Sequence, residues 1–436
     1  MRSPGPVAAG ALASVARRHV VLTALRWLPT GVLVPVVVVL MQERGLTLAQ
    51  VGAVAAVQGV VVLLLELPTG GLADAFGRRP VLVAASMLDV ASLALLAVAG
   101  TPGTFMLAWA VQGVYRALES GPLDAWYVDA SQALDPAADI EAGMGRAGTA
   151  AGLAIAAGAL ASAGLTSWWP SDGPRPLVVP VLAALALRAV DIVALARLMG
   201  EPRRQARRGA GALRAGVADV RRLVRRTVGL VVRSRALSSL AAVELSWGAG
   251  LAAVELFSAP RLVELTGDAT AGVAAFALAA AAAWAMSGLG AALTGRVTAL
   301  PGGSPARVGA ALRVVQGGMV AVIALVGGPV AMVAGYLGFY LVHGMANAVH
   351  YGMVHRLVGP DERTTVLSAH SLAARAGGIA TGLGLGPVAA GAGITWAMLA
   401  ASVVLAAAAP LYLTAGRAGV PVDVDARDDM ADRVPG

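Results

Sequence analysis

The chain has 436 residues, of which 58% are hydrophobic and only 13% are charged, and its mean hydropathy is +0.75. This composition excludes an ordinary soluble domain and predicts a protein embedded in a lipid bilayer. Because the sequence contains no cysteine, it also excludes disulfides, thiol catalysis and cysteine-ligated metals.

Long apolar runs follow one another along the whole chain. A helix needs about 20 mainly apolar residues to cross the hydrocarbon core of a bilayer. Runs of this kind lie at roughly 20–41, 49–68, 80–99, 103–123, 143–164, 177–198, 238–259, 270–293, 307–326, 329–352, 364–386 and 393–414. Helices satisfy their own backbone groups in lipid, so the sequence predicts an all-α membrane protein with twelve transmembrane helices.

The basic residues indicate the orientation of these helices, and all 33 of them are arginine. With the N-terminus in the cytoplasm, 23 arginines fall in cytoplasmic segments, and three, Arg44, Arg175 and Arg261, fall in external ones. The positive-inside rule therefore predicts that both termini are cytoplasmic. The net charge of +8 is then a signal of topology, and we expect no nucleic-acid partner. The lack of lysine and cysteine, with abundant alanine, glycine and arginine, indicates a bacterial source and hence the bacterial cytoplasmic membrane.

The segment between the second and third runs, residues 70–80, reads GGLADAFGRRP. Its distinctive positions are Gly70, Leu72, Asp74, Gly77, Arg78 and Arg79. The segment resembles a cytoplasmic loop signature of the major facilitator superfamily, G-x-L-a-D-r-x-G-r-[kr], and departs from it at Ala75, where a basic residue is usual. The resemblance implies a secondary transporter in which Asp74, Arg78 and Arg79 form a gating loop between its inward- and outward-facing states.

A weaker copy of this loop indicates an internal duplication. It follows 218 residues later, at Gly288, Ala291, Gly295 and Arg296. The duplication predicts two pseudo-symmetric six-helix bundles, and the resemblance implies that the substrate binds near the midplane between them. The expected divisions are an N-terminal bundle at 1–198, a basic cytoplasmic linker at 199–237, a C-terminal bundle at 238–415 and an acidic, disordered tail at 416–436.

Charged and polar residues inside the apolar runs are costly in lipid, so each is a candidate functional residue. In the implied architecture the first, fourth, seventh and tenth helices line the cavity. The candidates for substrate and proton binding on these helices are Arg26, Gln112, Arg116, Glu119, Glu244, Glu255, His343 and Asn347. The spacing of 112, 116 and 119 places three of them on one helical face. We expect all eight to face one aqueous cavity.

A carboxyl group removed from water binds a proton more readily, so Glu119, with Glu244 or Glu255, is predicted to carry the coupling proton. Two alternatives remain open. Arg116 and Glu119 can instead form a structural pair, and His343 can be a hydrogen-bonded packing residue.

A pair of arginines is predicted to act outside the cavity. Arg146-Ala147-Gly148 recurs as Arg375-Ala376-Gly377 in the eleventh helix. Because Arg146 and Arg375 occupy matching positions in the two halves, we expect them to serve interdomain gating.

Residues 66–69 and 120–126 also resemble segments of bacterial drug exporters in the superfamily. The predicted function is proton-coupled export of small molecules by alternating access, carried out by a monomer that needs no cofactor because the proton gradient supplies the energy. Uptake by proton symport or facilitated diffusion is one alternative, and a non-transporting membrane sensor or scaffold is another. The sequence contains no nucleophile motif, metal-ligand cluster or phosphate-binding glycine loop that would indicate an enzyme.

Overall fold

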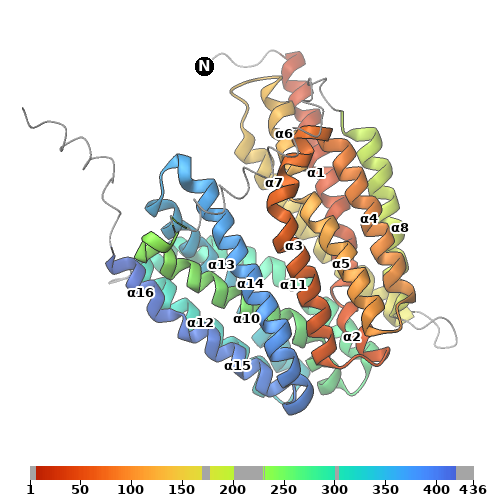
Figure 1. Ribbon diagram of the computed structural model, residues 1–436, viewed down its shortest axis with the longest axis vertical. Helices are drawn as coiled ribbons and strands as arrows, with labels where there is room; N and C mark the ends of the chain where they lie inside the picture. The colour runs from red at the N-terminus through yellow and green to blue at the C-terminus, as the bar shows by residue number, and fades with distance from the viewer. Residues whose placement is uncertain (1–5, 169–176, 201–228, 230, 300–303, 419–436) are drawn as a thin grey trace, which may run out of the picture.

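The computed structural model describes residues 6–168, 177–200, 229, 231–299 and 304–418, apart from the side chains of residues 6–9, 67, 68, 70, 71, 74, 75 and 360–365. All regular structure in these ranges is helical (Figure 1). The first half contains α1 (Pro6–Leu33), α2 (Val37–Glu43), α3 (Leu48–Phe76), α4 (Arg78–Val98), α5 (Pro102–Glu119), α6 (Pro122–Gln132), α7 (Ile140–Trp168) and α8 (Val178–Leu198). The second half contains α10 (Arg235–Thr266), α11 (Ala269–Thr298), α12 (Pro305–Leu325), α13 (Pro329–Leu357), α14 (Pro360–Ala392), α15 (Ile394–Ala407) and α16 (Ala409–Arg417).

Each predicted apolar run corresponds to helical structure, with three differences. The first run is not one helix, because the chain turns at residues 34–36 between α1 and α2, and the last run is divided at Ala408. Helix α6 was not predicted, and it is separated from α5 by Gly121, whose φ of 93° is left-handed. In the described part, 10 segments are long and apolar enough to cross a membrane, and neither α5 nor α14 is among them. The count of twelve spans therefore stays a prediction.

Polar residues at the helix starts fix several of these boundaries. Thr47 accepts a hydrogen bond from the backbone N–H of Gln50, and the Gln50 side chain accepts one from the backbone N–H of Thr47. Thr101 and Thr104 make the same reciprocal pair at the start of α5, where Pro102 follows the cap. These capping boxes satisfy N–H groups that have no partner inside the helix.

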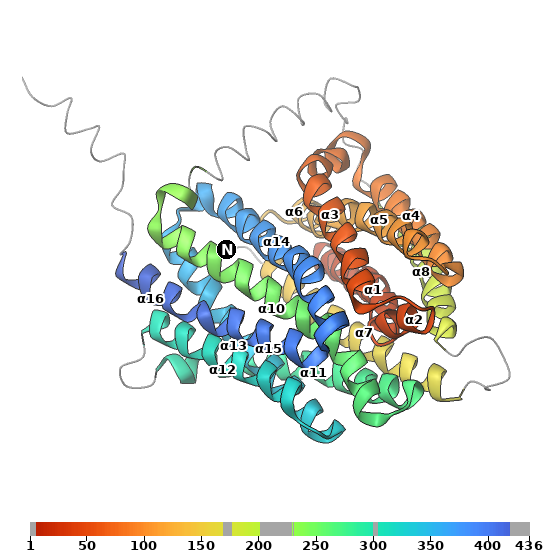
Figure 2. The same cartoon turned by 60° about the horizontal axis from the view of Figure 1, so that its bottom comes forward.

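The helices form two groups that meet along two lines (Figures 1 and 2). Helices α1 to α8 pack mainly among themselves, as do α10 to α16. The main contacts between the groups are α3 with α14 and α7 with α11. Helix α3 approaches α14 backbone to backbone, since a Cβ atom added to Gly52 would lie 2.1 Å from the carbonyl oxygen of Gly382. We refer to the end of the molecule with α2 and α15 as the α2 end, and to the opposite end as the α6 end.

Two arginines at the α2 end occupy equivalent places in the two groups. Arg44 donates hydrogen bonds to the carbonyls of Leu96, Ala97 and Ala99 at the end of α4. Arg261, which is 217 residues later, donates to the carbonyls of Ala324 and Val326 at the end of α12. An arginine at a helix C-terminus satisfies free carbonyls and interacts favourably with the helix dipole. These contacts give a structural role to Arg44 and Arg261, two of the three arginines in segments that are predicted to be external.

Replacing Arg44 or Arg261 by alanine is expected to destabilise the protein by about 1–2 kcal/mol, because charge-assisted hydrogen bonds to helix-terminal carbonyls are lost. The measurement is thermal unfolding of the purified variants in detergent. Arg17→Ala, which removes an exposed arginine from the interior of α1, is the control. Equal melting temperatures for all three variants and the unaltered protein would contradict this role.

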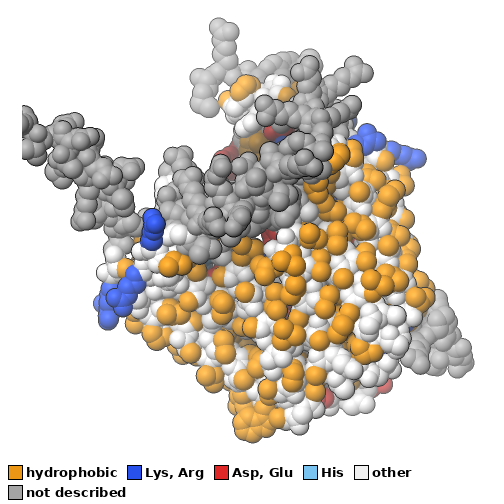
Figure 3. All heavy atoms as spheres, in the orientation of Figure 1, with side chains coloured by type: hydrophobic (Ala, Val, Ile, Leu, Met, Phe, Trp, Pro, Cys, Tyr) orange, Lys and Arg blue, Asp and Glu red, His pale blue; other side chains and the backbone are white. Residues whose placement is uncertain are grey.

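The lateral surface matches a lipid environment. Figure 3 shows hydrophobic side chains across the visible face, with arginine side chains toward its edges. Large apolar side chains such as Leu64, Val98 and Trp396 are exposed, which is unusual for a protein surrounded by water. The protein is thus an integral membrane protein that crosses the bilayer several times.

Candidate functional site

A buried ion network ties α1, α4 and α8 together. The guanidinium of Arg188 donates from Nε to Asp89 Oδ2 at 2.7 Å, from Nη1 to Asp191 Oδ2 at 3.2 Å and from Nη2 to the backbone carbonyl of Arg26 at 3.3 Å. Ser86 also donates to Asp191 at 2.9 Å. Removing one partner would leave an uncompensated charge in the interior, so this network holds the middle of α1 in place.

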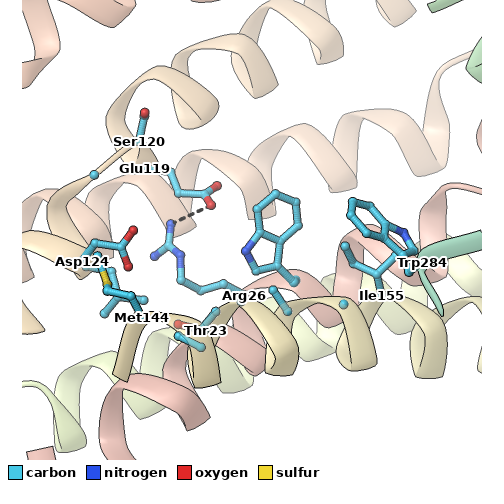
Figure 4. Close-up of a pocket in the computed structure, with 15 residues that line it drawn as sticks. Thr23, Arg26, Glu119, Ser120, Asp124, Met144, Ile155 and Trp284 are labelled. Atoms are coloured by element: carbon cyan, nitrogen blue, oxygen red, sulfur yellow. Dashed lines mark ion pairs between the residues drawn. The ribbon is translucent and has the colours of Figure 1, made fainter. Parts of the chain in front are cut away.

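Beside this network, Arg26 of α1 and Glu119 of α5 form a loose ion pair (Figure 4). Arg26 Nη2 lies 3.5 Å from Glu119 Oε1, and Arg116 Nη1 lies 3.9 Å from Glu119 Oε2. Among the described residues, neither Nη atom of Arg26 nor Glu119 Oε2 has a hydrogen-bond partner, although all three atoms are buried. Unpaired buried polar atoms are costly, so this pair has capacity to bind water, a proton or a solute.

These atoms border a cavity of ≈ 440 Å³. The lining residues are Thr23, Arg26, Trp27, Glu119, Ser120, Gly121, Leu123, Asp124, Met144, Ala147, Gly148, Ala151, Gly152, Ile155 and Trp284. Figure 4 shows Asp124, Arg26 and Glu119 toward one side and Ile155 and Trp284 toward the other. The small residues of α7 leave room for a ligand, and the volume suits a small molecule.

This cavity differs from the predicted one in the helices that form it. Helices α1 and α5 contribute, as expected for the first and fourth runs, but α6, α7 and Trp284 of α11 replace α10 and α13. Of the predicted cavity residues, it contains only Arg26 and Glu119. Sequence analysis missed the wall made by α7 because its glycines and alanines carry no chemistry that a pattern could reveal.

The remaining candidates of α5 lie close by. Gln112 accepts a hydrogen bond from Gln58 Nε2 of α3 at 2.6 Å. Arg116 is 30% exposed, and its guanidinium lies 5.3 Å from the ring centre of Trp27, within the range of a cation–π interaction. Arg116 lies 3.9 Å from Glu119, a distance that fits a structural ion pair between the two side chains. The role of Arg116 in proton coupling stays a prediction.

The two glutamates of α10 face different surroundings. Glu255 is exposed and lies within electrostatic range of Arg116 in the other group and of Tyr336 and Tyr340 in α13. It therefore borders the space between the two groups. Glu244 is 1% exposed and is enclosed in the second group, so the two do not share one cavity as predicted.

Hydrogen bonds define the state of His343. Trp247 Nε1 is 3.1 Å from His343 Nδ1, and Asn347 is 3.1 Å from His343 Nε2. Because an indole nitrogen only donates, His343 Nδ1 must accept, so the imidazole is neutral and carries its proton on Nε2. The amide oxygen of Asn347 has no partner in the described part, and exchanging its O and N atoms lets that oxygen accept from Nε2. This arrangement favours the packing interpretation of His343.

A family model described as Major Facilitator Superfamily matches residues 20–382. The chain belongs to the major facilitator superfamily. It is accordingly a transporter rather than an enzyme. No curated protein sequence matches it.

Solved structures with the same fold agree with this assignment. The nucleoside transporter NupG has a TM-score of 0.73 at 13% identity, over 92% of this chain and 99% of NupG. A bacterial homolog to the human lysosomal transporter Spinster, in an inward-facing and occupied conformation, has a TM-score of 0.70 at 16% identity, over 96% and 98%. The human organic anion transporter MFSD10 (TETRAN) has a TM-score of 0.60 at 17% identity, over 92% and 99%. At these identities the likeness concerns the fold, and the resemblance to drug exporters stays a prediction.

The superfamily loop signature joins α3 to α4 at the α6 end. Gly77 adopts a φ of 94°, which favours glycine, at the junction of the two helices. Arg78 pairs with Asp129 of α6 at 2.8 Å, and Arg79 donates to the carbonyl of Ala196 near the end of α8 at 2.5 Å. Both arginines thus anchor α4 within its own group. The side chain of Asp74 lies outside the described part of the structure, so the predicted latch at Asp74 stays a prediction.

In the described part of the chain, an ion pair joins the two groups of helices. Arg375 Nε of α14 donates to Glu66 Oε2 of α3 at 2.9 Å. Arg146, its predicted counterpart, is exposed and donates to the carbonyl of Ala142 in its own helix. Sequence analysis did not select Glu66 as a site residue, although a carboxylate inside an apolar run was a usable signal.

Reversing one charge of this pair is expected to slow transport roughly tenfold, because the attraction in a partly exposed pair becomes repulsion between like charges. The variants are Glu66→Arg, Arg375→Glu and the double exchange, and the measurement is the initial rate of transport in proteoliposomes. The double exchange should recover most of the rate. A double variant no faster than the slower single variant would argue against a direct interaction.

Proposed function

We propose that the protein is a proton-coupled secondary transporter that exports small molecules by alternating access. The observation that carries the proposal is the loose pair of Arg26 and Glu119 on the wall of a ≈ 440 Å³ cavity, with buried atoms that lack partners in the described part. A loose pair of this kind lets a solute and a proton compete for one carboxylate. A solute that donates a hydrogen bond to Glu119 Oε2 binds while the carboxyl group is ionised, and a proton on Glu119 displaces it.

The same geometry links binding to ionisation. When Glu119 is ionised, Arg26 compensates its charge, and burial makes that compensation strong. When Glu119 is protonated, it no longer offers a carboxylate to a hydrogen-bond donor of the substrate, so proton uptake and substrate binding exclude one another. Substrate and proton are then exchanged at one place, as coupled transport requires.

The direction of transport follows from orientation in this proposal. We infer from the arginine distribution that the α2 end lies outside. At this end α3 and α14 are in backbone contact. The cavity borders the exposed Asp124 at the first turn of α6, so we propose that the solute enters from the cytoplasm. The described fold is also that of the inward-facing Spinster homolog.

We infer two six-helix bundles at 1–198 and 238–415, a location in the bacterial cytoplasmic membrane with both termini cytoplasmic, a monomeric state, and the proton gradient as energy source without a cofactor. The linker at 199–237 and the tail at 416–436 lie largely outside the described residues.

Proton movement in proteoliposomes tests the proposal. A pH dye is trapped inside, and nucleosides, organic anions, drugs, dyes and sugars are added outside one class at a time. A compound that triggers proton flux, with the flux abolished by a protonophore, supports coupled transport. Movement of the compound in the direction opposite to export would establish uptake. Transport that is unchanged by the protonophore would establish facilitated diffusion.

A further inference from the structure

A second buried polar cluster lies in the C-terminal group of helices and shares no residue with the cavity. Its titratable members are Glu244 of α10, His350 of α13 and His370 of α14, and each is at most 1% exposed. Sequence analysis assigned only Glu244 to a site.

The three side chains are in direct contact. His350 Nε2 lies 3.2 Å from His370 Nδ1 and 3.5 Å from Glu244 Oε2. His350 Nδ1 lies 3.1 Å from the hydroxyl of Tyr412 in α16, and Tyr351 donates to Glu244 Oε1 at 3.1 Å. Glu244 Oε2 and His370 Nε2 are buried without a hydrogen-bond partner among the described residues. His350 is thus hydrogen-bonded to Tyr412 and His370 and lies within ion-pair distance of Glu244.

A fixed charge faces this cluster from α12. Arg313 is fully buried and lies within electrostatic range of Glu244, His350 and Tyr412. Its Nη1 donates to Gln316 at 2.6 Å, while Nε and Nη2 have no partner in the described part. With Glu244 ionised and both imidazoles neutral, the cluster has no net charge. One added proton makes it positive.

The geometry offers a route for that proton. We assign the proton of neutral His350 to Nε2, which donates to His370 Nδ1, while Tyr412 donates to His350 Nδ1. A proton from water that reaches the hydroxyl of Tyr412 displaces the hydroxyl proton to His350 Nδ1, and His350 passes its Nε2 proton to His370 Nδ1 or Glu244 Oε2. Tyr412 keeps the incoming proton and His350 stays neutral with its proton on Nδ1, so the added proton ends on His370 or Glu244.

We infer that Glu244, His350 and His370 form a second proton-binding site, which connects α10, α13 and α14. The site stands on its own geometry, and its part in transport rests on the function proposed above. His370 lies five residues before Arg375, whose ion pair with Glu66 joins the two groups of helices. Proton uptake that alters the bond between His350 and His370 therefore acts on the helix that contacts the other half.

Nuclear magnetic resonance of the ¹⁵N-histidine-labelled protein in detergent tests the site, since the chain has only 5 histidines. Assigned by single substitutions, the ring nitrogens of His350 and His370 are expected to change together with pH, as coupled groups do. Glu244→Gln is expected to move their shared midpoint by about one pH unit, because it removes an adjacent charge. The exposed His355 is the internal control and should keep its midpoint. Independent titration of His350 and His370, or midpoints unaffected by Glu244→Gln in a variant with unchanged thermal unfolding, would overturn the inference.

A transport assay separates this inference from the proposed function. Glu244→Gln is expected to shift the pH profile of transport, whereas His355→Gln should leave it in place. If His350 and His370 titrate together but transport does not depend on the proton gradient, the proton-binding site stands and proton-coupled transport is rejected. If transport is proton-coupled but the two histidines titrate independently, proton-coupled transport stands and the site is rejected.

Discussion

Replacing Gly382 by valine is expected to reduce the transport rate about 10- to 100-fold. A Cβ atom at this position would lie 2.4 Å from the carbonyl oxygen of Gly52, closer than any real contact, so α14 and α3 would have to separate. Overpacking of this kind costs about 1–3 kcal/mol, which corresponds to the expected range of rates. The variant should therefore disfavour the state in which the α2 end is closed.

The matched control is Gly384→Val, on the same helix, where nothing lies within 4 Å of an added Cβ atom. Because the chain has no cysteine, a single Ala49→Cys substitution in the first turn of α3 gives a clean site for labelling. Labelling should be faster in the Gly382→Val background than in the Gly384→Val background. If both glycine variants transport and label alike, the close contact of α3 and α14 is not part of the transport cycle.

Replacing Glu119 by glutamine is expected to abolish proton movement coupled to the substrate, with a loss of at least about 100-fold. The amide has the shape of the protonated acid but cannot release a proton, so Arg26 permanently lacks its counter-charge. Transport that remains should be downhill and independent of pH. The assay compares dye-reported proton flux with substrate flux in the same proteoliposomes.

Two further variants make this result specific. Glu141→Gln, at an exposed carboxylate in the first turn of α7, should keep both fluxes. Arg26→Gln combined with Glu119→Gln should be better folded than Arg26→Gln alone, because it removes the unpaired buried charge. Retention of normal coupling by Glu119→Gln would reject this carboxylate as the proton carrier and direct attention to Glu255 and Glu244.

Some parts of the site could be predicted from the sequence, and others could not. Arg26 and Glu119 were identified because a charge in an apolar run is conspicuous wherever the helix faces. The ion pair of Arg375 with Glu66 could not be assigned, because the partners are 309 residues apart and no local pattern relates them. His350 was not selected at all, and the structure shows it fully buried at the centre of a polar cluster.

The sequence by itself determined that this protein lies in a membrane, that it is helical, and near which residues most of its helices begin. These properties depend on the length and apolarity of local runs, on capping residues such as Thr47 and Thr101, and on a loop signature shared by the superfamily. Tertiary structure alone decided which polar groups meet. The helices are rich in alanine and glycine and apolar on all sides, so their sequences do not distinguish a face toward lipid from a face toward another helix. Glu244 and Glu255 lie eleven residues apart on one helix, and only the packing around each level of α10 decides that Glu244 is enclosed while Glu255 is exposed.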